Sequence, residues 1–312
     1  MTTTDSELYV GQDSEADSGI LGRLPVSFES ILLAPSIIVL GVLSIIPLLA
    51  LLWMSVMKIN AQPGQEPTFI GIQNYQAMFN EAIINSWEVT AVYVGGALAL
   101  QIVLGTLIAI LLHRVSRGEN FMTGIIIMPM MIAPVVVGLL WQFLLDPSFG
   151  LYTWLLNQVG LFTNNPVLGT EPSALIAVII MDTWQWTPLV VLIILAGLKS
   201  IPQQLYEAAR VDGATLWSEF RYITLPLLAP ALAIAVLLRS MDLMRYFTKI
   251  YLATGGGPAS STKIIGFQIY EQALRFYKLG YGAALGLVML AVTVIIGIVF
   301  VESIMGGAGD NE

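Results

Sequence analysis

Residues 200–230 read SIPQQLYEAARVDGATLWSEFRYITLPLLAP, and this stretch decides how the rest of the chain is organised. Its pattern predicts two short helices joined by a turn. Ser200 can cap the first helix, with Pro202 in its first turn. Gly213 can adopt a positive φ and so end that helix. The stretch carries several charges, whereas the sequence on both sides of it is strongly apolar.

The second helix of this stretch is expected to be amphipathic. Its apolar residues recur at i, i+4, i+7 and i+11, which places them on one helical face. They are Leu216, Phe220, Ile223 and Leu227. Pro226 can begin the helix that follows, because the N–H that proline lacks has no partner at a helix start. Periodicity alone therefore predicts an amphipathic connector between two apolar segments.

The composition places the chain in lipid. Hydrophobic residues make up 56%, charged residues 11%, and the mean hydropathy is +0.80, whereas a soluble domain carries about 25% charged residues. The net charge of -8 argues against nucleic-acid binding, which needs a basic face. Cysteine is absent and His113 is the only histidine, so neither a thiolate metal site nor a histidine cluster can form. We expect no cofactor and no catalytic residues.

Four charge-free apolar segments are long enough to cross a membrane, because a span of about 30 Å needs about 20 residues. Two further segments, at 173–198 and 226–252, are interrupted by charged residues. Backbone groups in lipid must be paired internally, so the spans are expected to be helices. The sequence thus predicts an all-α polytopic membrane protein. Its six transmembrane helices are expected at about residues 31–57, 89–112, 121–145, 173–198, 226–252 and 279–301. The fifth is apolar only in its first half, and its assignment needs further support.

The two ends of the chain are expected to be tails. Residues 1–29 hold six acidic residues and one arginine among many serines and threonines, a composition typical of disorder. Residues 306–312 form the second tail. Prolines inside the spans, such as Pro129 and Pro134 in the third, are expected to kink helices without preventing a crossing.

The string EAARVDGA, followed by a spaced Ile-x-Leu-Pro, resembles the EAA loop of ATP-binding-cassette importer permeases. That pattern runs E-A-A, three residues, glycine and then I-x-L-P. The matching positions that the resemblance marks as ATPase-coupling residues are Glu207, Ala208, Ala209, Asp212, Gly213, Leu225 and Pro226. In that family the loop is cytoplasmic and docks as a coupling helix in a groove of the ATPase subunit, a form of helix-in-groove recognition. The resemblance implies a cytoplasmic coupling loop at 199–225.

Four other stretches are similar, in the same order, to the sugar-permease branch that includes maltose- and glycerol-phosphate-type permeases. They are FIGIQNYQAMF at 69–79, PMMIAPVVVGLLWQFLLDPSFG at 129–150, WQWTPLVVLIILAGLKSIP at 184–202 and LATGGGPASST at 252–262. The resemblance covers about residues 30–305, the expected permease domain. The chain departs from the branch at Phe247-Thr248, where phenylalanine-aspartate is usual, and at Lys249, where an apolar residue is usual.

The resemblance implies a type I ABC importer permease fold in the cell membrane, with both termini cytoplasmic. With the coupling loop inside, residues 226–252 must cross outward. The implied function is to form the path for a sugar or related solute. The implied partners are an ABC ATPase dimer, a second permease subunit in a heterodimer and an extracellular solute-binding protein. The P-loop pattern G-x-x-x-x-G-K-[ST] does not occur in the sequence, so ATP hydrolysis is expected from a partner subunit rather than from this chain.

Charged and aromatic residues inside the spans are candidates for the solute path, because intramembrane charges are costly. Arg239, Asp242 and Arg245 fall at i, i+3 and i+6, within about a third of the helix circumference. They can line the path or form a structural salt bridge. Asp182 lies in the fourth span beside Trp184 and Gln185, which offer a ring and an amide to a sugar. The alternative for the tryptophan is an interfacial aromatic belt.

An ion-coupled secondary transporter is the main alternative function. Its transport would use intramembrane acids such as Asp182 and Asp242 as proton sites, and would need no ATPase. A membrane-embedded enzyme is disfavoured by the single histidine and by acidic residues that lack metal-ligand spacing.

Overall fold

The computed structural model describes residues 28–60, 64–115, 117–163 and 165–309, and it divides into two compact units after Ala50. The described part of the first unit is helix α1 (Phe28–Ser55) up to that residue, an apolar helix with Pro35 and Pro47 inside it. The acidic tail expected at 1–29 lies outside the described residues, apart from the first two residues of α1. At the other end, helix α13 (Leu279–Gly309) extends into the tail expected at 306–312.

Five helices in the described residues are long and apolar enough to cross a membrane, and a bent helix pair provides a sixth crossing. Besides α1 and α13, the long helices are α3 (Glu81–His113), α7 (Glu171–Ser200) and the segment Leu216–Arg245. The all-α polytopic architecture predicted from the sequence is therefore observed. The second span is longer than expected, because its helix begins at Glu81, where Asn80 accepts a hydrogen bond from the Ile83 N–H and so caps the helix.

The third crossing is a broken helix rather than the single helix expected at 121–145. Its parts are α4 (Glu119–Ile127), the 3₁₀ turn η2 (Met128–Met131) and α5 (Pro134–Leu144), with a 90° bend between the two halves. Ala133 has an extended backbone, as expected for a residue that precedes a proline. Two prolines five residues apart thus turn the expected kink into a sharp break.

The fifth crossing begins ten residues earlier than the expected 226–252, within the loop expected at 199–225. Helix α9 (Leu216–Glu219), the π-helical turn η4 (Phe220–Thr224) and α10 (Leu225–Arg245) form one continuous helix. The chain leaves the helix at Tyr246 and resumes in α11 (Thr248–Thr254). The charged residues near the end of the expected span therefore lie on two helices rather than one.

The shorter elements lie between the spans. Strands β1 (Met57–Lys58) and β2 (Thr68–Phe69) pair antiparallel, and α2 (Gln73–Gln76) follows them. The others are α6 (Leu151–Gln158), the 3₁₀ turn η3 (Val167–Gly169), α8 (Gln203–Val211), α12 (Ile265–Tyr270) and the π-helical turn η5 (Glu271–Arg275).

One core of the second unit forms where α3, α7 and α10 pack together, and another includes residues of α3, α5, α7 and α11. Small residues allow close approach at these crossings, as is usual between membrane helices. A Cβ on Gly105 would lie 2.6 Å from Val190 Cγ1, and one on Gly197 would lie 2.8 Å from Ala231 Cβ. Most large apolar side chains outside this core are exposed, as lipid-facing surfaces require.

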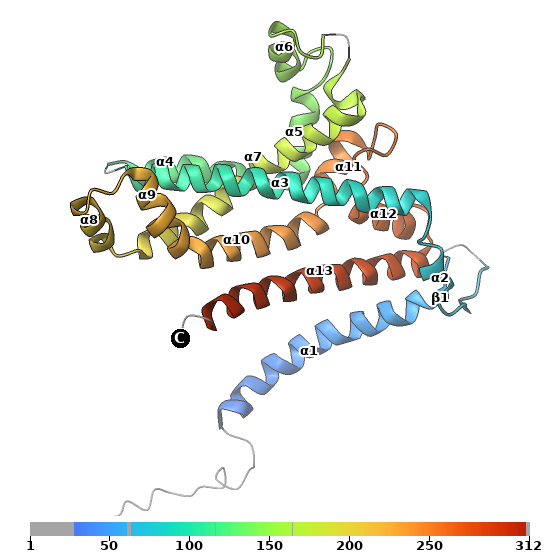
Figure 1. Ribbon diagram of the computed structural model, residues 1–312. Helices are drawn as coiled ribbons and strands as arrows, with labels where there is room; N and C mark the ends of the chain where they lie inside the picture. Colours follow the sequence, from blue (N-terminus) through green and yellow to red (C-terminus); the bar gives the residue numbers. More distant parts are fainter. Residues whose placement is uncertain (1–27, 61–63, 116, 164, 310–312) are drawn as a thin grey trace, which may run out of the picture. The chain divides into compact units, whose positions relative to one another are not determined.

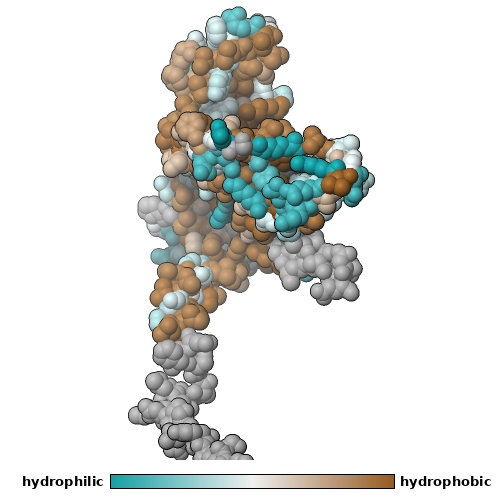
Figure 2. Space-filling model, turned by 90° about the vertical axis from the view of Figure 1, so that its left-hand side faces the viewer, coloured by the Kyte–Doolittle hydropathy of each residue, from teal (hydrophilic) through white to brown (hydrophobic). Residues whose placement is uncertain are grey.

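The helices of the second unit place their connections at two ends. The α8–α9 hairpin and α4 lie at one end of the helices, and α2 and α12 lie at the other (Figure 1). Hydrophilic residues gather at the hairpin end, whereas apolar residues cover much of the rest of the face that Figure 2 shows. The sequence pattern and the surface therefore agree that the hairpin faces water.

Candidate translocation and coupling sites

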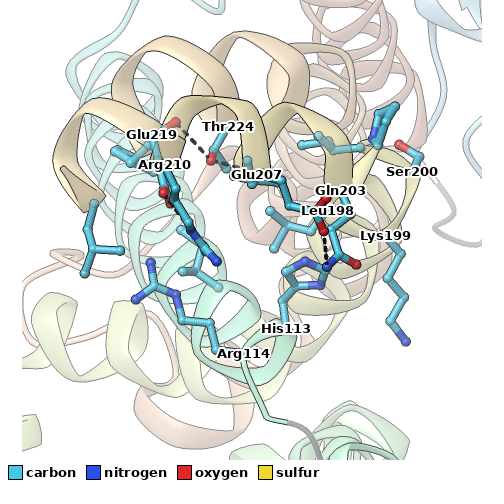
Figure 3. A pocket seen from close by; sticks show the side chains of 16 residues that line it. His113, Arg114, Leu198, Lys199, Ser200, Gln203, Glu207, Arg210, Glu219 and Thr224 are labelled. Atoms are coloured by element: carbon cyan, nitrogen blue, oxygen red, sulfur yellow. Dashed lines mark hydrogen bonds and ion pairs between the residues drawn. The ribbon is translucent and has the colours of Figure 1, made fainter. Parts of the chain in front are cut away.

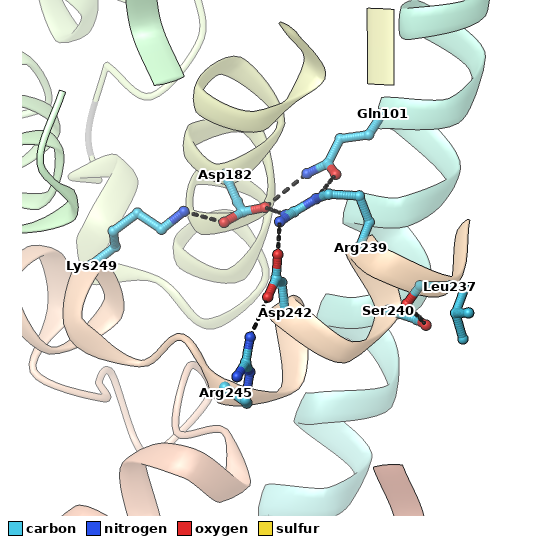
Figure 4. A network of polar contacts seen from close by, with 8 residues as sticks. All are labelled: Gln101, Asp182, Leu237, Arg239, Ser240, Asp242, Arg245 and Lys249. Carbon is cyan, nitrogen blue, oxygen red and sulfur yellow. Dashed lines mark hydrogen bonds and ion pairs between the residues drawn. The ribbon is translucent and has the colours of Figure 1, made fainter. Parts of the chain in front are cut away.

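Asp182 is the centre of a buried polar network that joins four helices. It lies on α7, and its Oδ2 accepts hydrogen bonds from Gln101 Nε2 on α3 at 2.7 Å and from Arg239 Nη2 on α10 at 2.8 Å. Its Oδ1 accepts a hydrogen bond from Lys249 Nζ on α11. Arg239 Nε also donates to Gln101 Oε1 at 2.7 Å, which closes a ring of three side chains (Figure 4).

The three charged side chains of this network are buried, so each charge is costly unless it is paired. Arg239 is 0% exposed, and the side chains of Asp182 and Lys249 are each 1% exposed. One carboxylate thus faces two buried cations. Charges in a low-dielectric interior are tolerated only when they are paired and hydrogen-bonded. The network therefore fixes the relative positions of α3, α7, α10 and α11.

The network continues to an exposed pair at the end of α10. Asp242 Oδ2 lies 3.7 Å from Arg239 Nη1, and its Oδ1 accepts a hydrogen bond from Arg245 Nη2 at 2.5 Å. The Arg245 side chain is 63% exposed, compared with 22% for Asp242. The structure thus brings together Asp182, Arg239, Asp242 and Arg245 in one chain of contacts. The buried ion pair between Asp182 and Arg239 lies at one end of this chain, and the exposed Arg245 lies at the other.

Two aromatic rings accompany the charges. The Arg239 guanidinium carbon lies 5.0 Å from the centre of the Trp186 ring, and that ring lies 5.9 Å from the ring of Tyr246. Arginine over an indole face is a favourable cation–π arrangement. The indole N–H of Trp186 and Nη1 of Arg239 are buried and have no hydrogen-bond partner among the described residues.

The other two candidates on α7 do not join this cluster. Trp184 packs edge-on against Trp141 of α5, with ring centres 6.2 Å apart, and lines an apolar cavity of about 460 Å³. Gln185 is fully buried, and its Nε2 donates to the Ile132 carbonyl at 2.8 Å. That carbonyl lies at the break between η2 and α5, so the amide of Gln185 supports the bend in the third crossing.

Sequence reasoning missed Gln101, Trp186 and Lys249 as members of the site. Each had a visible signal: a lone amide in a span, a second tryptophan beside Trp184, and a lysine where the resemblance expects an apolar residue. Gln101 and Lys249 are 81 and 67 residues away from Asp182 in the sequence. Contacts over such distances depend on helix packing, which no local spacing encodes.

The α8–α9 hairpin is held by contacts between its two helices. Arg210 Nε donates to Glu219 Oε1 at 3.0 Å, and the hydroxyls of Tyr206 and Thr224 lie 3.1 Å apart. Glu219 is 5% exposed, so this ion pair is shielded on one side. Thr215 accepts a hydrogen bond from the Ser218 N–H and caps α9.

Gly213 ends α8 as expected, with φ +79°. The Gly213 N–H bonds to the Arg210 carbonyl at 3.1 Å and the Ala214 N–H bonds to the Ala209 carbonyl at 2.9 Å. These two bonds define a Schellman motif, in which glycine takes the left-handed position without steric cost. The expected cap at Ser200 is wrong: α7 continues through that residue, and Pro202 stands at the cap position of α8.

The apolar face expected on the second helix is not its buried face. Leu216 and Leu227 are 59% and 48% exposed, whereas Glu219, Thr224 and Leu228 are buried. The π-helical turn η4 has i→i+5 hydrogen bonds and so holds more residues per turn than an α-helix. The spacing of an ideal α-helix therefore no longer describes which side chains share a face. In α8, Glu207 and Ala208 are exposed, and Glu207 accepts a hydrogen bond from Gln203 at 3.0 Å.

A polar cavity of about 770 Å³ lies beneath the hairpin. Its walls are the ends of α3 and α7 together with α8, α9 and η4. His113 and Arg114, at the end of α3, face Arg210 and Glu207 of the hairpin across it (Figure 3). The cavity thus separates part of the hairpin from the ends of α3 and α7.

Comparison with known proteins gives this arrangement its context. The sequence profile of the binding-protein-dependent transport system inner membrane components matches residues 101–306. The trehalose/maltose transport system permease protein of Thermococcus litoralis is 35% identical over 81% of this chain and 84% of its own length. The sulfoquinovosyl glycerol transport system permease protein of Agrobacterium fabrum is 32% identical, over 88% of this chain and 89% of its own length.

Solved structures show the same fold. A bacterial ABC transporter involved in the import of the acidic polysaccharide alginate has a chain that matches with a TM-score of 0.75 at 24% identity. The match covers 88% of this chain and 94% of that one. The type I importer permease fold expected from the EAA-type loop is therefore confirmed. By its sequence profile, its relatives and its fold, the chain belongs to the family of binding-protein-dependent transport system inner membrane components, the permease subunits of ATP-binding-cassette importers.

Proposed function

We propose that this permease forms the path for a sugar or a related hydroxylated solute, which an external binding protein delivers. Similar permeases carry names that refer to trehalose/maltose, trehalose and sulfoquinovosyl glycerol. A similar fold occurs in an alginate transporter solved in complex with an alginate pentasaccharide-bound periplasmic protein. Together these relatives favour a carbohydrate over an amino acid or an ion.

The coupling function rests on one observation, the exposed apolar surface of the α8–α9 hairpin. Val211 is 88% exposed and Trp217 is 70% exposed, although the hairpin lies at the hydrophilic end of the helices (Figure 2). Exposed apolar side chains rimmed by polar residues mark protein interaction sites. We assign this surface to the ATPase subunit, which hydrolyses ATP in place of this chain.

The remaining assembly follows from this placement. The hairpin and both termini are then cytoplasmic, and α2 and α12 face the external binding protein. A second permease subunit, forming a heterodimer, completes the path opposite α10. ATP binding closes the ATPase dimer and moves the hairpin, and the helices alternate between outward and inward access. Family membership favours this ATP-driven cycle over the ion-coupled alternative.

Replacing Val211 with glutamate is expected to weaken ATPase binding at least about tenfold, because it buries a charge in an apolar contact. The measurement is co-purification of the ATPase subunit with the tagged permease. Phe79→Glu is the matched control, since Phe79 is 86% exposed but precedes α3 at the other end of the helices. Full ATPase recovery with Val211→Glu would contradict the assignment of the hairpin.

For the solute path, we propose the exposed end of the charged network together with the two rings beside it. Arg245 and Asp242 offer a donor and an acceptor, and Trp186 and Tyr246 offer apolar ring faces. A sugar presents hydroxyls and an apolar face to such a set. Trp184 and Gln185, which the sequence suggested for this role, lie apart from this cluster and contact Trp141 of α5 and the Ile132 carbonyl before it.

Replacing Arg245 with glutamine is expected to lower ATP-driven uptake severalfold without changing the stability of the permease. The side chain is mostly exposed, and such substitutions usually change the free energy of unfolding by less than about 0.5 kcal/mol. Initial uptake rates and thermal unfolding, measured together, test this. The control is Arg275→Gln, since the Arg275 side chain is also mostly exposed, at 61%, and forms its ion pair with buried Glu271 at 2.9 Å away from the network. Equal uptake by both variants would remove Arg245 from the path.

A further inference from the structure

The charged network that runs from Lys249 to Arg245 contains more cations than carboxylates (Figure 4). Its cations are Arg239, Lys249 and Arg245, and its carboxylates are Asp182 and Asp242. Among the described residues, no other aspartate or glutamate forms an ion pair with these cations. Lys249 contacts a carboxylate, which favours its charged form. The network thus lacks one negative charge, and an uncompensated charge in a poorly solvated site is costly.

The outer end of this network is the part that a ligand can reach. Arg239, Lys249 and Asp182 are at most 1% exposed, whereas the Arg245 side chain is 63% exposed. Arg245 is the last residue of α10, and the chain leaves the helix at Tyr246. A guanidinium binds a carboxylate or a phosphate through two parallel N–H bonds. Arg245 is therefore the group of this network that can bind an anion entering from solution.

Asp242 is shared unequally between two arginines. Its Oδ1 accepts a hydrogen bond from Arg245 Nη2 at 2.5 Å, whereas its Oδ2 lies 3.7 Å from Arg239 Nη1. The second distance is too long for a hydrogen bond, and the buried Nη1 has no hydrogen-bond partner among the described residues. Such an unpaired donor on a charged group is costly. A shift of the Asp242 carboxylate toward Arg239 would pair Nη1 and loosen the contact with Arg245, which frees that guanidinium for another anion.

We infer that the transported solute carries an anionic group, a carboxylate or a phosphate, and that Arg245 binds it. The inference rests on the proposed function, because it takes the exposed end of the network to line the solute path. The anion supplies the missing negative charge, while Asp242 moves from Arg245 to the unpaired Nη1 of Arg239. The rings of Trp186 and Tyr246 remain available to the apolar face of the sugar. The substrate class is therefore an acidic sugar rather than a neutral one.

Glucuronate and glucose are the probes, because they share a pyranose ring and differ only in a carboxylate that replaces a hydroxymethyl group. The complete importer, in nanodiscs of a zwitterionic lipid and without its binding protein, is titrated with each sugar at low ionic strength. Saturation-transfer NMR gives the dissociation constants. We expect wild type to bind glucuronate roughly 5- to 10-fold more tightly than glucose, between the worth of an exposed ion pair and that of a hydrogen bond to a buried charge. Equal constants, or no binding of glucuronate, would overturn the inference.

Two variants of the network test the exchange of partners. Arg245→Gln is expected to bind both sugars with equal affinity, because the cation that distinguishes them is lost. Asp242→Asn is expected to bind glucuronate severalfold more tightly than wild type does, because asparagine no longer competes with the ligand as an anion. If the pair between Asp242 and Arg245 served only the structure, each variant would change the binding of both sugars alike, and the inference would be wrong.

Arg275→Gln is the matched control, since the Arg275 side chain is 61% exposed and also pairs with a carboxylate, away from the network. It should keep the preference of wild type for glucuronate. A preference lost in this variant as well would show general attraction by positive charge, which would contradict a site at Arg245.

Acetate tests for an adventitious ion only, because it carries the carboxylate without the sugar ring. At equal concentration it should displace little glucuronate, and complete displacement would overturn the inference. ATP-driven uptake by the importer with its binding protein tests the proposed function separately. Binding of glucuronate that depends on Arg245, in an importer that accumulates no sugar, would leave the anion site standing and reject the assigned transport. Uptake of sugar by an importer that binds glucose and glucuronate equally would have the opposite meaning.

Discussion

Replacing Asp182 with asparagine is expected to prevent stable folding of the permease or to lower its unfolding temperature sharply. The change removes the only carboxylate that contacts both Arg239 and Lys249 in the network. Lys249 then loses the carboxylate it contacts, and Arg239 keeps only the longer contact with Asp242 at 3.7 Å. Breaking a buried ion pair by removing one partner typically costs about 3–5 kcal/mol, a large part of the stability of most proteins. Thermal unfolding of the detergent-solubilised permease, followed by size-exclusion chromatography, measures the loss.

Two further variants show whether the loss of charge causes the loss of stability in Asp182→Asn. Asp242→Asn changes a partly exposed carboxylate of the same chain of contacts, and it should cost much less. A triple variant, Asp182→Leu with Arg239→Met and Lys249→Met, removes all three buried charges and should recover part of the lost stability, because apolar side chains of similar size often replace buried ion pairs. If Asp182→Asn unfolds at the wild-type temperature, the network does not hold the four helices together.

Replacing Gly213 with valine is expected to abolish most ATP-driven uptake while the permease still folds. Gly213 has φ +79°, and a Cβ there would meet nothing within 4 Å, so the effect comes from the backbone and not from a clash. A left-handed conformation costs an L-residue about 1–2 kcal/mol, and more for a β-branched one. The Schellman motif should open, and the angle between α8 and α9 should change. Uptake into vesicles and the stimulation of ATPase activity by the loaded binding protein measure the uncoupling.

Gly118→Val is the matched control for this change. Gly118 has φ +84° with open space around its Cβ direction, but it lies before α4 and outside the hairpin. Both variants suffer the same backbone strain, and only Gly213→Val should uncouple transport. Glu207→Lys, which reverses an exposed charge on α8, is expected to act in the same direction. Uptake retained in both hairpin variants would disprove the coupling function of residues 199–225.

Local sequence signals were sufficient for the elements of this protein but not for all of their boundaries. Apolar runs of about 20 residues predicted the crossings, because lipid requires that length of apolar helix. The end of α8 at Gly213 and the EAA-type string were visible because both are local features. The break in the third crossing was expected only as a kink, since Pro129 and Pro134 show where a helix is disturbed but not by what angle.

The residues proposed for the solute path show the limit of local reasoning most clearly. Spacing placed Arg239, Asp242 and Arg245 near one another on a helix, and their contacts confirm it. Spacing also grouped Trp184 and Gln185 with Asp182, because they are neighbours in the chain. In a helix, consecutive residues point about 100° apart, so Asp182 and Trp186 face the charged network while Trp184 faces α5.

The sequence by itself determined that the chain crosses the membrane as helices and carries an EAA-type string typical of the importer family, because hydropathy, length and a contiguous motif are properties of neighbouring residues. The tertiary structure alone decided which polar groups meet. Gln101, Asp182, Arg239 and Lys249 lie on four helices, and only their packing makes one carboxylate the shared partner of an amide and two cations. The same packing buries Oε1 of Gln268 and of Gln272 without a hydrogen-bond partner among the described residues, a property that no stretch of sequence shows.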